Sequence, residues 1–389
     1  MRRLILLAAA VLLCFSASGA KRYQIQYGPW VTNVTETSFT VLWTTAQDNL
    51  SAVQVAPDDG SAFEAEQRPF FVQNIAGRNP ACKLHCVTVS GLKPGTTYRY
   101  RITGREVRDA SDPYGIEYRK AGTDITLRYA HTLDPKADSC SFCMVNDMHF
   151  NADKYRTLVK GKNHGNTDFL VLNGDIVSYS QSIDSVIKYS FWPGKALLNE
   201  VPVVYARGNH ESRGADFAKV PALFPTPTGQ FYYSFRQGPV AFLVLDGGED
   251  KPDGSAEYSG YAHFDDYRIG ELEWLIKAVN EPSFADAPVK VAIVHMPPFG
   301  GKGSWYGQRW LHDNILPVLN EAGIDILLGA HHHKYMYLEP GEDGNNFPIV
   351  VNSNSERLDF SAGAAGFSVK IFDVEGNRTH SLDFETLKR

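Results

Sequence analysis

Five short clusters of aspartate, asparagine and histidine in this chain have the side chains needed to hold metal ions and to move a proton. Carboxylate, amide and imidazole groups are ligands of transition metals, and a histidine can also protonate a leaving group. Asp147 and His149 are two residues apart, so in an extended segment both side chains would face one ion. The clusters are Asp147-Met-His149, Asn173-Gly-Asp175, Arg207-Gly-Asn-His-Glu211, His295 and His331-His-His333.

Each cluster follows an apolar run that is typical of a β-strand, and helical patterns separate the runs. Such alternation indicates parallel strands in an α/β layer fold, whose ligand sites lie beyond the carboxyl ends of the strands. Five strand ends are therefore expected to face one crevice. The runs end at Asn146, Leu172, Ala206, Val294 and Leu328.

The side-chain types in the crevice suit a site for two metal ions. Asp175 can bridge both ions through its two oxygens, and a carboxylate between cations is stable where a lone buried carboxylate would be costly. Asn209, His295 and His331 then complete the coordination of one ion, and His333 completes that of the other. The mixed imidazole and carboxylate set favours zinc, iron or manganese over magnesium or calcium. Two such ions about 3.5–4 Å apart would activate a bridging water as a hydroxide nucleophile for in-line displacement at phosphorus.

The order and spacing of the five clusters resemble the calcineurin-like binuclear metallophosphoesterases across residues 141–389. The resemblance implies that His210 is the general acid or a phosphate contact. It implies a first metal held by Asp147, His149, Asp175 and His333, and a second held by Asp175, Asn209, His295 and His331.

Two positions depart from the related families. In purple acid phosphatases a metal-binding tyrosine stands three residues after the Gly-Asp aspartate, where this chain has Ser178, so we expect no tyrosinate colour. At the positions that correspond to 178 and 179, protein Ser/Thr phosphatases have an Asp that orients the catalytic histidine and an Arg that binds phosphate. This chain has neither, so the sequence does not identify the group that orients His210. Tyr179 is a candidate for part of the phosphate grip. Arg207 and Arg213 either contact phosphate or pair with acidic neighbours.

Residues 24–133 are expected to form a separate β-sandwich. The segment Ser38–Thr45 alternates with strand period, and so does Thr97–Ile102 after a Leu92-Lys-Pro-Gly turn. The pattern resembles a fibronectin type III domain with Trp43 in its core, of the kind that precedes the catalytic domain in purple acid phosphatases. Residues 141–389 are expected to form the α/β metallophosphoesterase domain, with two mixed sheets packed face to face between helices. The expected helices cover 154–162, 181–191, 267–279 and 310–322.

Residues 1–20 have the pattern of a signal peptide, with Arg2 and Arg3 before an apolar segment that ends near a small-residue cleavage site. We therefore expect an exported protein, periplasmic or secreted, without a transmembrane span. The chain has 38 basic and 44 acidic residues and no basic run. This balance argues against nucleic acid as the main partner and favours a small phosphorylated substrate. The oligomeric state stays unknown.

Four cysteines would remain after cleavage, and an even number in an exported chain favours disulfides. Cys82 and Cys86 would lie about 13 Å apart in one extended strand, too far to bond each other. A bridge from this pair to Cys140 or Cys143 is then expected. A four-thiolate zinc site is the alternative.

The resulting hypothesis is an exported hydrolase that cleaves phosphomonoesters by direct attack of a metal-bridging hydroxide, without a covalent intermediate. A phosphodiesterase or nucleotide-cleaving enzyme with the same two-metal site is the nearest alternative. An adhesion protein whose second domain has lost activity is the alternative outside enzymes. The complete set of metal-type residues at the strand ends disfavours it.

Overall fold

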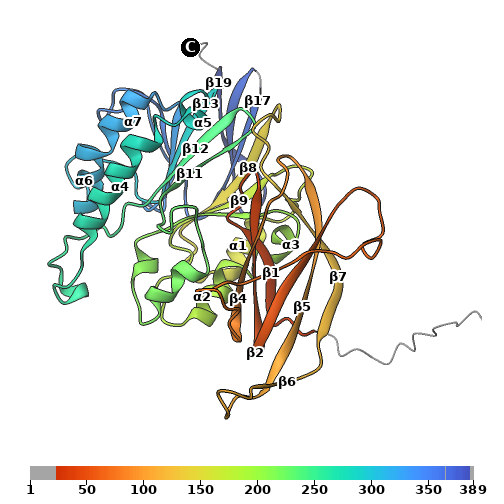
Figure 1. The fold of residues 1–389 in the computed structure, drawn as a ribbon. Coiled ribbons are helices and arrows are strands. Elements are labelled where there is room, and N and C mark those ends of the chain that lie inside the picture. The colour runs from red at the N-terminus through yellow and green to blue at the C-terminus, as the bar shows by residue number, and fades with distance from the viewer. Residues whose placement is uncertain (1–22, 364, 386–389) are drawn as a thin grey trace, which may run out of the picture.

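The computed structural model describes residues 23–363 and 365–385, and the expected signal peptide lies outside this range. Figure 1 shows two units side by side: a layer of long strands near the N-terminus, and a larger α/β unit with helices on its outer faces. Within the described residues, no helix is long and apolar enough to cross a membrane.

The N-terminal unit is built from seven strands around an aromatic core. Trp43 is fully buried there together with Phe39 and Ile102, and its indole nitrogen donates to the Tyr23 hydroxyl at 3.0 Å. The strands are β1 (Tyr27–Thr32), β2 (Ser38–Pro57), β3 (Phe70–Val72), β4 (Cys82–Ser90), β5 (Thr97–Asp109), β6 (Glu117–Tyr118) and β7 (Gly122–His131).

The α/β unit contains two sheets that pack face to face, which confirms the expected fold class. The first contains β8 (Cys140–Val145), β9 (Phe169–Asn173), β10 (Val203–Ala206), β17 (Arg357–Gly363), β18 (Gly366–Phe372) and β19 (Arg378–Glu385). The second contains β11 (Tyr233–Gln237), β12 (Val240–Leu245), β13 (Val289–Val294), β14 (Ile326–Gly329), β15 (Met336–Leu338) and β16 (Ile349–Val351). Between them, Phe142 and Phe169 of the first sheet meet the edge of Phe242 at 5.7 and 5.6 Å.

Parallel pairing brings the carboxyl ends of the central strands to one edge. In the first sheet β8, β9 and β10 are parallel neighbours, and in the second β12, β13 and β14 are parallel neighbours. Because the strands are nearly continuous in apolar residues, both faces of each sheet can be covered. The loops after β8, β9, β10, β13 and β14 carry the polar clusters.

Helices cover the outer faces of both sheets (Figure 1). The expected helix over 310–322 is instead two helices that meet at Ile315, because Pro317 in the first turn of the second one has no N–H to continue the first. The α-helices are α1 (Ala152–Leu158), α2 (Ile183–Ser190), α3 (Lys195–Leu198), α4 (Phe264–Ala278), α5 (Pro282–Ala285), α6 (Tyr306–Asn314) and α7 (Leu316–Ala322).

The two units share one sheet, because β1 pairs in parallel with β10 through Thr32 and Val203. Trp30 of β1 enters the core of the α/β unit, where its ring stacks on Phe191 at 4.6 Å. The domain boundaries drawn from the sequence stay a prediction, but the units are joined by backbone pairing and by a shared core.

The expected disulfides are wrong: within the described residues, the four cysteines are free thiols. Cys140 and Cys143 are three residues apart in β8, so they face opposite sides of the strand and enter different cores. The Cys82 thiol lies 3.0 Å from the Leu84 carbonyl oxygen. The zinc alternative also finds no support, since the groups of potential metal ligands in the described chain contain no cysteine.

Candidate metal centre

Side chains from the five loops meet in three overlapping groups whose ligand atoms lie within 4.8 Å of one another. Asp175 belongs to two of these groups, one with His149 and His210 and the other with His295 and His331. The third group contains Asp147, His149 and His333. The arrangement places Asp175 between two clusters of imidazoles, as a carboxylate shared by two ions requires.

Short distances link the ligand atoms on each side of Asp175. His149 Nε2 lies 3.2 Å from His333 Nε2, and His333 Nε2 lies 3.3 Å from Asp147 Oδ1. On the other side, His295 Nε2 lies 3.2 Å from Asp175 Oδ2. Two imidazole nitrogens at such a distance need a proton or a metal ion between them, because two lone pairs repel each other.

Four buried atoms of the site have no hydrogen-bond partner within the described residues: Asp147 Oδ1, Asn209 Oδ1, His295 Nε2 and His331 Nε2. A buried acceptor without a partner is costly, and such groups in a native protein call for an explanation. A cation on one side of Asp175 would satisfy Asp147 Oδ1, and a cation on the other side would satisfy Asn209 Oδ1, His295 Nε2 and His331 Nε2. The donor set therefore fits a binuclear metal site, and the imidazoles favour zinc, iron or manganese.

Hydrogen bonds on the opposite atoms aim these ligands inward. His295 Nδ1 donates to the Asn173 carbonyl oxygen at 2.8 Å, which leaves Nε2 as the ligand atom. Asp147 Oδ2 accepts from the Asn146 amide at 2.8 Å and from the His331 backbone N–H at 3.0 Å, which leaves Oδ1 free for an ion.

The carboxylates control the charge of the site before metal binds. Burial alone would lower the pKa of His295, but the Asp175 and Asp147 carboxylates outweigh it and raise this pKa to about 10. Burial and the neighbouring His295 lower the pKa of His331 to about 4. Ligand binding to a metal needs neutral imidazole, so metal uptake must release the proton on His295.

The loops reach this geometry through left-handed backbone at five of the seven expected ligands: Asp147 (φ 51°), His149 (φ 45°), Asp175 (φ 51°), His331 (φ 72°) and His333 (φ 58°). This region is unfavourable for residues other than glycine, and such strain concentrates at functional sites. Asp147 and His149 do converge, but through this turn and not through the extended segment expected from their spacing.

Glu211 holds the β9 and β10 loops together. Its carboxylate accepts from the backbone N–H groups of Asp175 at 2.9 Å, Ile176 at 2.8 Å and Gly208 at 3.0 Å. Gly208 is needed because an added Cβ would lie 2.2 Å from Asp175 Oδ1 and 2.8 Å from Glu211 Oε2. The close approach of these loops positions Asp175 and Asn209 beside each other.

His210 lies beside the ligands and is partly exposed. Its Nδ1 donates to the Ser178 carbonyl oxygen at 2.8 Å, which supplies the orienting group that sequence reasoning did not find. Its Nε2 lies 3.9 Å from Asp175 Oδ2 and accepts from Arg213 Nη1 at 3.1 Å. The ring is held at both nitrogens, with Nε2 at the metal site.

The three candidate substrate contacts lie in different environments. Arg207 has 11% of its side chain exposed, pairs with Asp246 at 2.8 Å and lies over the Phe231 ring, so an acidic neighbour already engages its guanidinium. Arg213 pairs with Glu249 at 2.6 Å while it touches His210. Tyr179 is half exposed and packs its ring against Phe150, the neighbour of His149, at 5.2 Å.

Sequence reasoning missed the loop after β12, which contributes Asp246 and Glu249 to this network. The signal was present, because the apolar run Val240–Leu245 is followed by acidic residues as the other site strands are.

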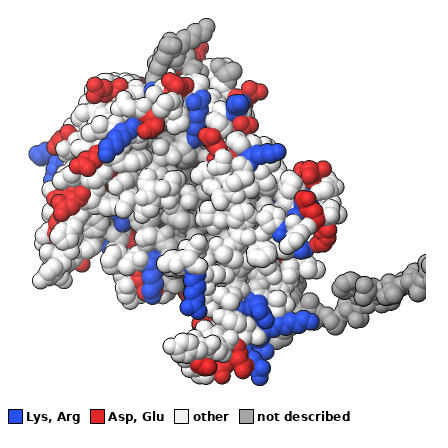
Figure 2. All heavy atoms as spheres, in the orientation of Figure 1, with Lys and Arg blue, Asp and Glu red and all other residues white. Residues whose placement is uncertain are grey.

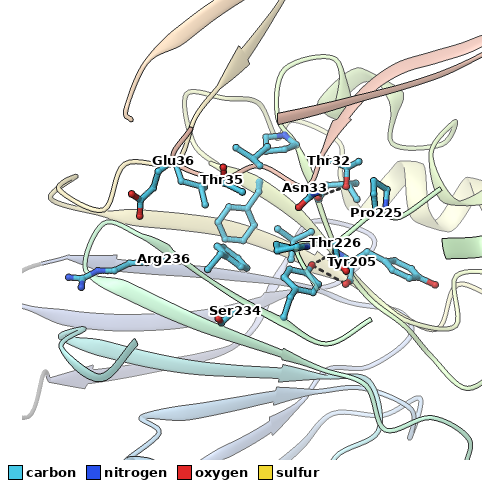
Figure 3. A pocket seen from close by; sticks show the side chains of 18 of the residues that line it. Thr32, Asn33, Thr35, Glu36, Tyr205, Pro225, Thr226, Ser234 and Arg236 are labelled. Atoms are coloured by element: carbon cyan, nitrogen blue, oxygen red, sulfur yellow. Dashed lines mark hydrogen bonds between the residues drawn. The ribbon is translucent and has the colours of Figure 1, made fainter. Parts of the chain in front are cut away.

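A cavity of about 350 Å³ lies elsewhere, at the junction of the two units. Figure 3 shows Tyr205 and Pro225 at one end and Arg236 at the other. The cavity borders Phe169 and Val203, the first residues of β9 and β10, so it lies at the opposite end of these strands from the metal site. None of the predicted site residues lines it.

Comparisons with known proteins agree with this geometry. Residues 141–335 match the family model described as calcineurin-like phosphoesterase, and residues 26–117 match the purple acid phosphatase N-terminal domain. Purple acid phosphatase 23 of Arabidopsis thaliana is 24% identical over 288 residues, which cover 65% of this chain and 57% of that protein. Purple acid phosphatase 15 of the same plant is 24% identical over 65% of this chain and 49% of that protein. The chain thus spans about half the length of these curated relatives.

Among solved structures, purple acid phosphatase PPD1 from yellow lupin (Lupinus luteus) seeds has the same fold. It superimposes with a TM-score of 0.66 and 13% sequence identity, over 92% of this chain and 74% of that one. The catalytic family model spans half of the chain and includes the five ligand loops. The chain therefore belongs to the calcineurin-like phosphoesterase family and carries an N-terminal domain of the purple acid phosphatase type.

Proposed function

We propose that this protein is an exported, binuclear metal-dependent phosphatase that hydrolyses small phosphomonoesters by direct attack of water on phosphorus. The observation that carries the proposal is the convergence of carboxylate and imidazole ligand atoms, within 4.8 Å of one another in each group, around Asp175, with His210 among them. Membership of the phosphoesterase family supports the same reaction class.

In this proposal seven side chains hold the metals. Bound ions supply Lewis-acid chemistry, since they activate water and stabilise negative charge on the phosphoryl oxygens. Asp147, His149, Asp175 and His333 would hold one ion, and Asp175, Asn209, His295 and His331 the other.

His210 would act as the general acid. Its Nδ1 keeps its proton and donates it in a hydrogen bond to the Ser178 carbonyl oxygen, so Nε2 is the atom that can carry a proton to the leaving-group oxygen. Nε2 now accepts from Arg213, so for this step it must leave Arg213, take up a proton from solvent and donate that proton to the leaving-group oxygen. The released guanidinium N–H would then be free to meet a phosphate oxygen, which makes Arg213 a better cationic substrate contact than Arg207, whose guanidinium is paired with Asp246.

Tyr179 would form one wall of the substrate site. Its half-exposed ring stands against Phe150, and it directly follows Ser178, which holds His210. A ring at this place can contact the leaving group, and its hydroxyl can reach a phosphate oxygen.

Hydrolysis of a nitrophenyl phosphomonoester and a bis-nitrophenyl diester by the purified protein tests the proposal. The protein is stripped with a chelator and reloaded separately with zinc, manganese or iron. We expect monoester hydrolysis to vanish on chelation and to return with at least one metal, while an Asp175→Asn variant stays inactive under each loading.

Preferential diester cleavage would replace the phosphomonoesterase proposal with the phosphodiesterase alternative. No hydrolysis of either ester under any loading, by folded protein that binds two ions, would contradict the enzyme proposal. Inversion of configuration at a chiral phosphorus is the expected signature of direct attack, and retention would indicate a covalent intermediate.

A further inference from the structure

Glu249 is a buried carboxylate that belongs to none of the five ligand loops yet reaches two of the site's functional groups. It lies in the loop after β12, forty residues beyond Asn209, and its side chain is completely shielded from solvent. Neither the metal-ligand groups nor the proposed mechanism includes it. Its carboxylate nevertheless accepts hydrogen bonds from Asn209, Arg213 and the backbone N–H of Asp250.

The first contact determines which end of the Asn209 amide faces the metal. Asn209 Nδ2 donates to Glu249 Oε1 at 3.4 Å, and Asn209 Oδ1 is the buried atom without a partner. An amide has a donor end and an acceptor end, whereas both Glu249 oxygens face donors here and accept from them. Glu249 therefore stabilises the orientation in which the oxygen, and not the NH₂ group, is available as a ligand.

The second contact fixes the guanidinium that touches His210. Arg213 binds Glu249 at two points, with Nη2 2.6 Å from Oε1 and Nε 3.0 Å from Oε2. This two-point geometry leaves Nη1 directed at His210 Nε2, 3.1 Å away. Because Glu249 is buried and held by the Asp250 N–H at 3.0 Å, it is a fixed anchoring point for the Arg213 side chain.

The surrounding charges keep this carboxylate in place. Asp250 lies 3.5 Å from Arg213, and Lys251 lies 2.9 Å from Asp250 and 3.9 Å from Glu249. Two cations thus balance two carboxylates in this small cluster.

We propose that Glu249 is a positioning residue that aligns a ligand of the second metal and the partner of the general acid through a single carboxylate. Residues that orient metal ligands from behind typically change metal affinity or activity by about 10- to 100-fold when they are replaced. The inference rests on the proposed function for its effect on turnover, but its effect on metal binding is independent of any reaction.

Glu249→Gln is the informative substitution because it keeps the shape and replaces one acceptor oxygen with a donor NH₂. At the Oε1 position this NH₂ would face the donors of Asn209, Arg213 and Asp250, whereas at the Oε2 position it would oppose Arg213 Nε. The side chain is therefore expected to place its NH₂ at the Oε2 position, which disturbs the contact with Arg213 and keeps the contact with Asn209. Glu249→Ala removes both oxygens and therefore both contacts. Glu257→Gln is the matched control, since Glu257 lies in the segment that follows, is half exposed and contacts Ser255 and Lys251.

The first readout is metal affinity, measured by competition with a chromophoric chelator and without substrate. We expect wild type and Glu257→Gln to bind two zinc ions alike. Glu249→Ala should bind one ion normally and the other about 10- to 100-fold more weakly. Arg213→Gln removes the second contact alone, so it should bind both ions as wild type does.

The second readout is the separate measurement of kcat and KM for the monoester at saturating metal. Glu249→Gln and Arg213→Gln should both lower kcat. Thermal unfolding reports whether each variant is folded. If Glu249→Ala does not fold, Glu249→Asp tests the same claim, because the shorter side chain keeps its charge but cannot reach Asn209 and Arg213 together.

Wild-type affinity for both ions in folded Glu249→Ala or Glu249→Asp would overturn the role toward Asn209. A kcat unchanged in both Glu249→Gln and Arg213→Gln, in an active enzyme, would overturn the role toward His210. Weakened binding of one ion in Glu249→Ala, in a protein that hydrolyses no phosphoester, would instead contradict the proposed function and leave the positioning role supported.

Discussion

At the scale of single residues, the metal centre depends on backbone conformations that its own ligands do not favour. Histidine and aspartate at positive φ are uncommon, yet five ligands adopt it. Hydrogen bonds between backbone groups, such as Asp147 N–H to the Gly174 carbonyl and His149 N–H to the Asp175 carbonyl, both at 3.0 Å, stabilise these turns.

Gly208 allows the β9 and β10 loops to touch, so Gly208→Ala should disrupt the centre. The new Cβ would overlap Asp175 Oδ1, and overpacking of this kind costs roughly 1–3 kcal/mol of folding free energy. We expect a variant that folds but has a lower unfolding temperature. Because Asp175 is shared by both proposed ions, the variant should bind fewer than two. Metal stoichiometry by mass spectrometry is the measurement, and Gly254→Ala, at a position with open space, is the control.

His210→Ala should lower kcat by about 10²- to 10⁴-fold, the usual contribution of a positioned general acid. Metal content should not change, because the atoms that hold the ions belong to other residues. His263, largely exposed at the start of α4, gives the control substitution His263→Ala. Unchanged turnover in His210→Ala would exclude His210 as the acid. A loss of kcat confined to substrates whose leaving group has a high pKa would support His210 as the general acid.

At the scale of elements, the sequence predicted the strands that carry ligands because each is an uninterrupted apolar run with a polar end. The strand Val289–Val294 was predicted with the bounds that the structure has. Contacts between distant loops could not be predicted in this way. Glu249 meets Asn209 only because β12 lies in the second sheet, and no local pattern indicates which sheet a strand joins. The same limit applies to Arg207, whose partner Asp246 is in that loop.

The cysteine prediction was wrong for a related reason. It rested on an even count and an exported chain, which do not indicate whether two distant strands bring their thiols together. Cys82 and Cys86 lie in β4 and Cys140 and Cys143 in β8, and no local pattern places these strands relative to each other.

Strand β1 joins the two units, so Trp30→Ala should destabilise both. The indole is fully buried and stacked on Phe191, and loss of such a ring costs about 3–5 kcal/mol. We expect wild type to unfold in one cooperative transition and the variant to unfold at lower denaturant. Tyr114→Ala, at a fully exposed aromatic residue of the same unit, should leave the midpoint unchanged. Two separate transitions in wild type would show that the shared core does not couple the units.

At the scale of the whole molecule, charge is distributed without a dominant patch on the face drawn in Figure 2. Acidic and basic side chains of the described residues are interspersed around its margin. This distribution agrees with a formal net charge of −6 and gives no electrostatic footprint for nucleic acid on that face.

The contact between the units includes a pair of histidines. The rings of His131, at the end of β7, and His164, in the loop after α1, stack at a centroid distance of 3.9 Å. His131 Nδ1 also pairs with the Thr97 hydroxyl at 2.8 Å. Burial, followed by the charge of His164, lowers the pKa of His131 to about 4, while Asp58 opposes this shift. Two cationic rings cannot keep this stacking, so the junction is built for neutral imidazole.

This pair makes the stability of the molecule depend on pH in a defined direction. The folded-state pKa of His131 lies below the value of about 6.5 in unfolded chains, so between these values the unfolded state binds more protons. The contribution of His131 to the free energy of unfolding is therefore fully present above about pH 6.5 and is lost as the pH falls toward 4. His131→Asn can keep the bond to Thr97 without titrating, so its unfolding temperature should fall less steeply over this range than that of wild type. The exposed His263→Asn should follow wild type. Parallel curves for all three proteins would place the acid sensitivity outside the junction. A flatter curve for His131→Asn would assign part of the acid sensitivity to protonation of His131 at the contact between the units.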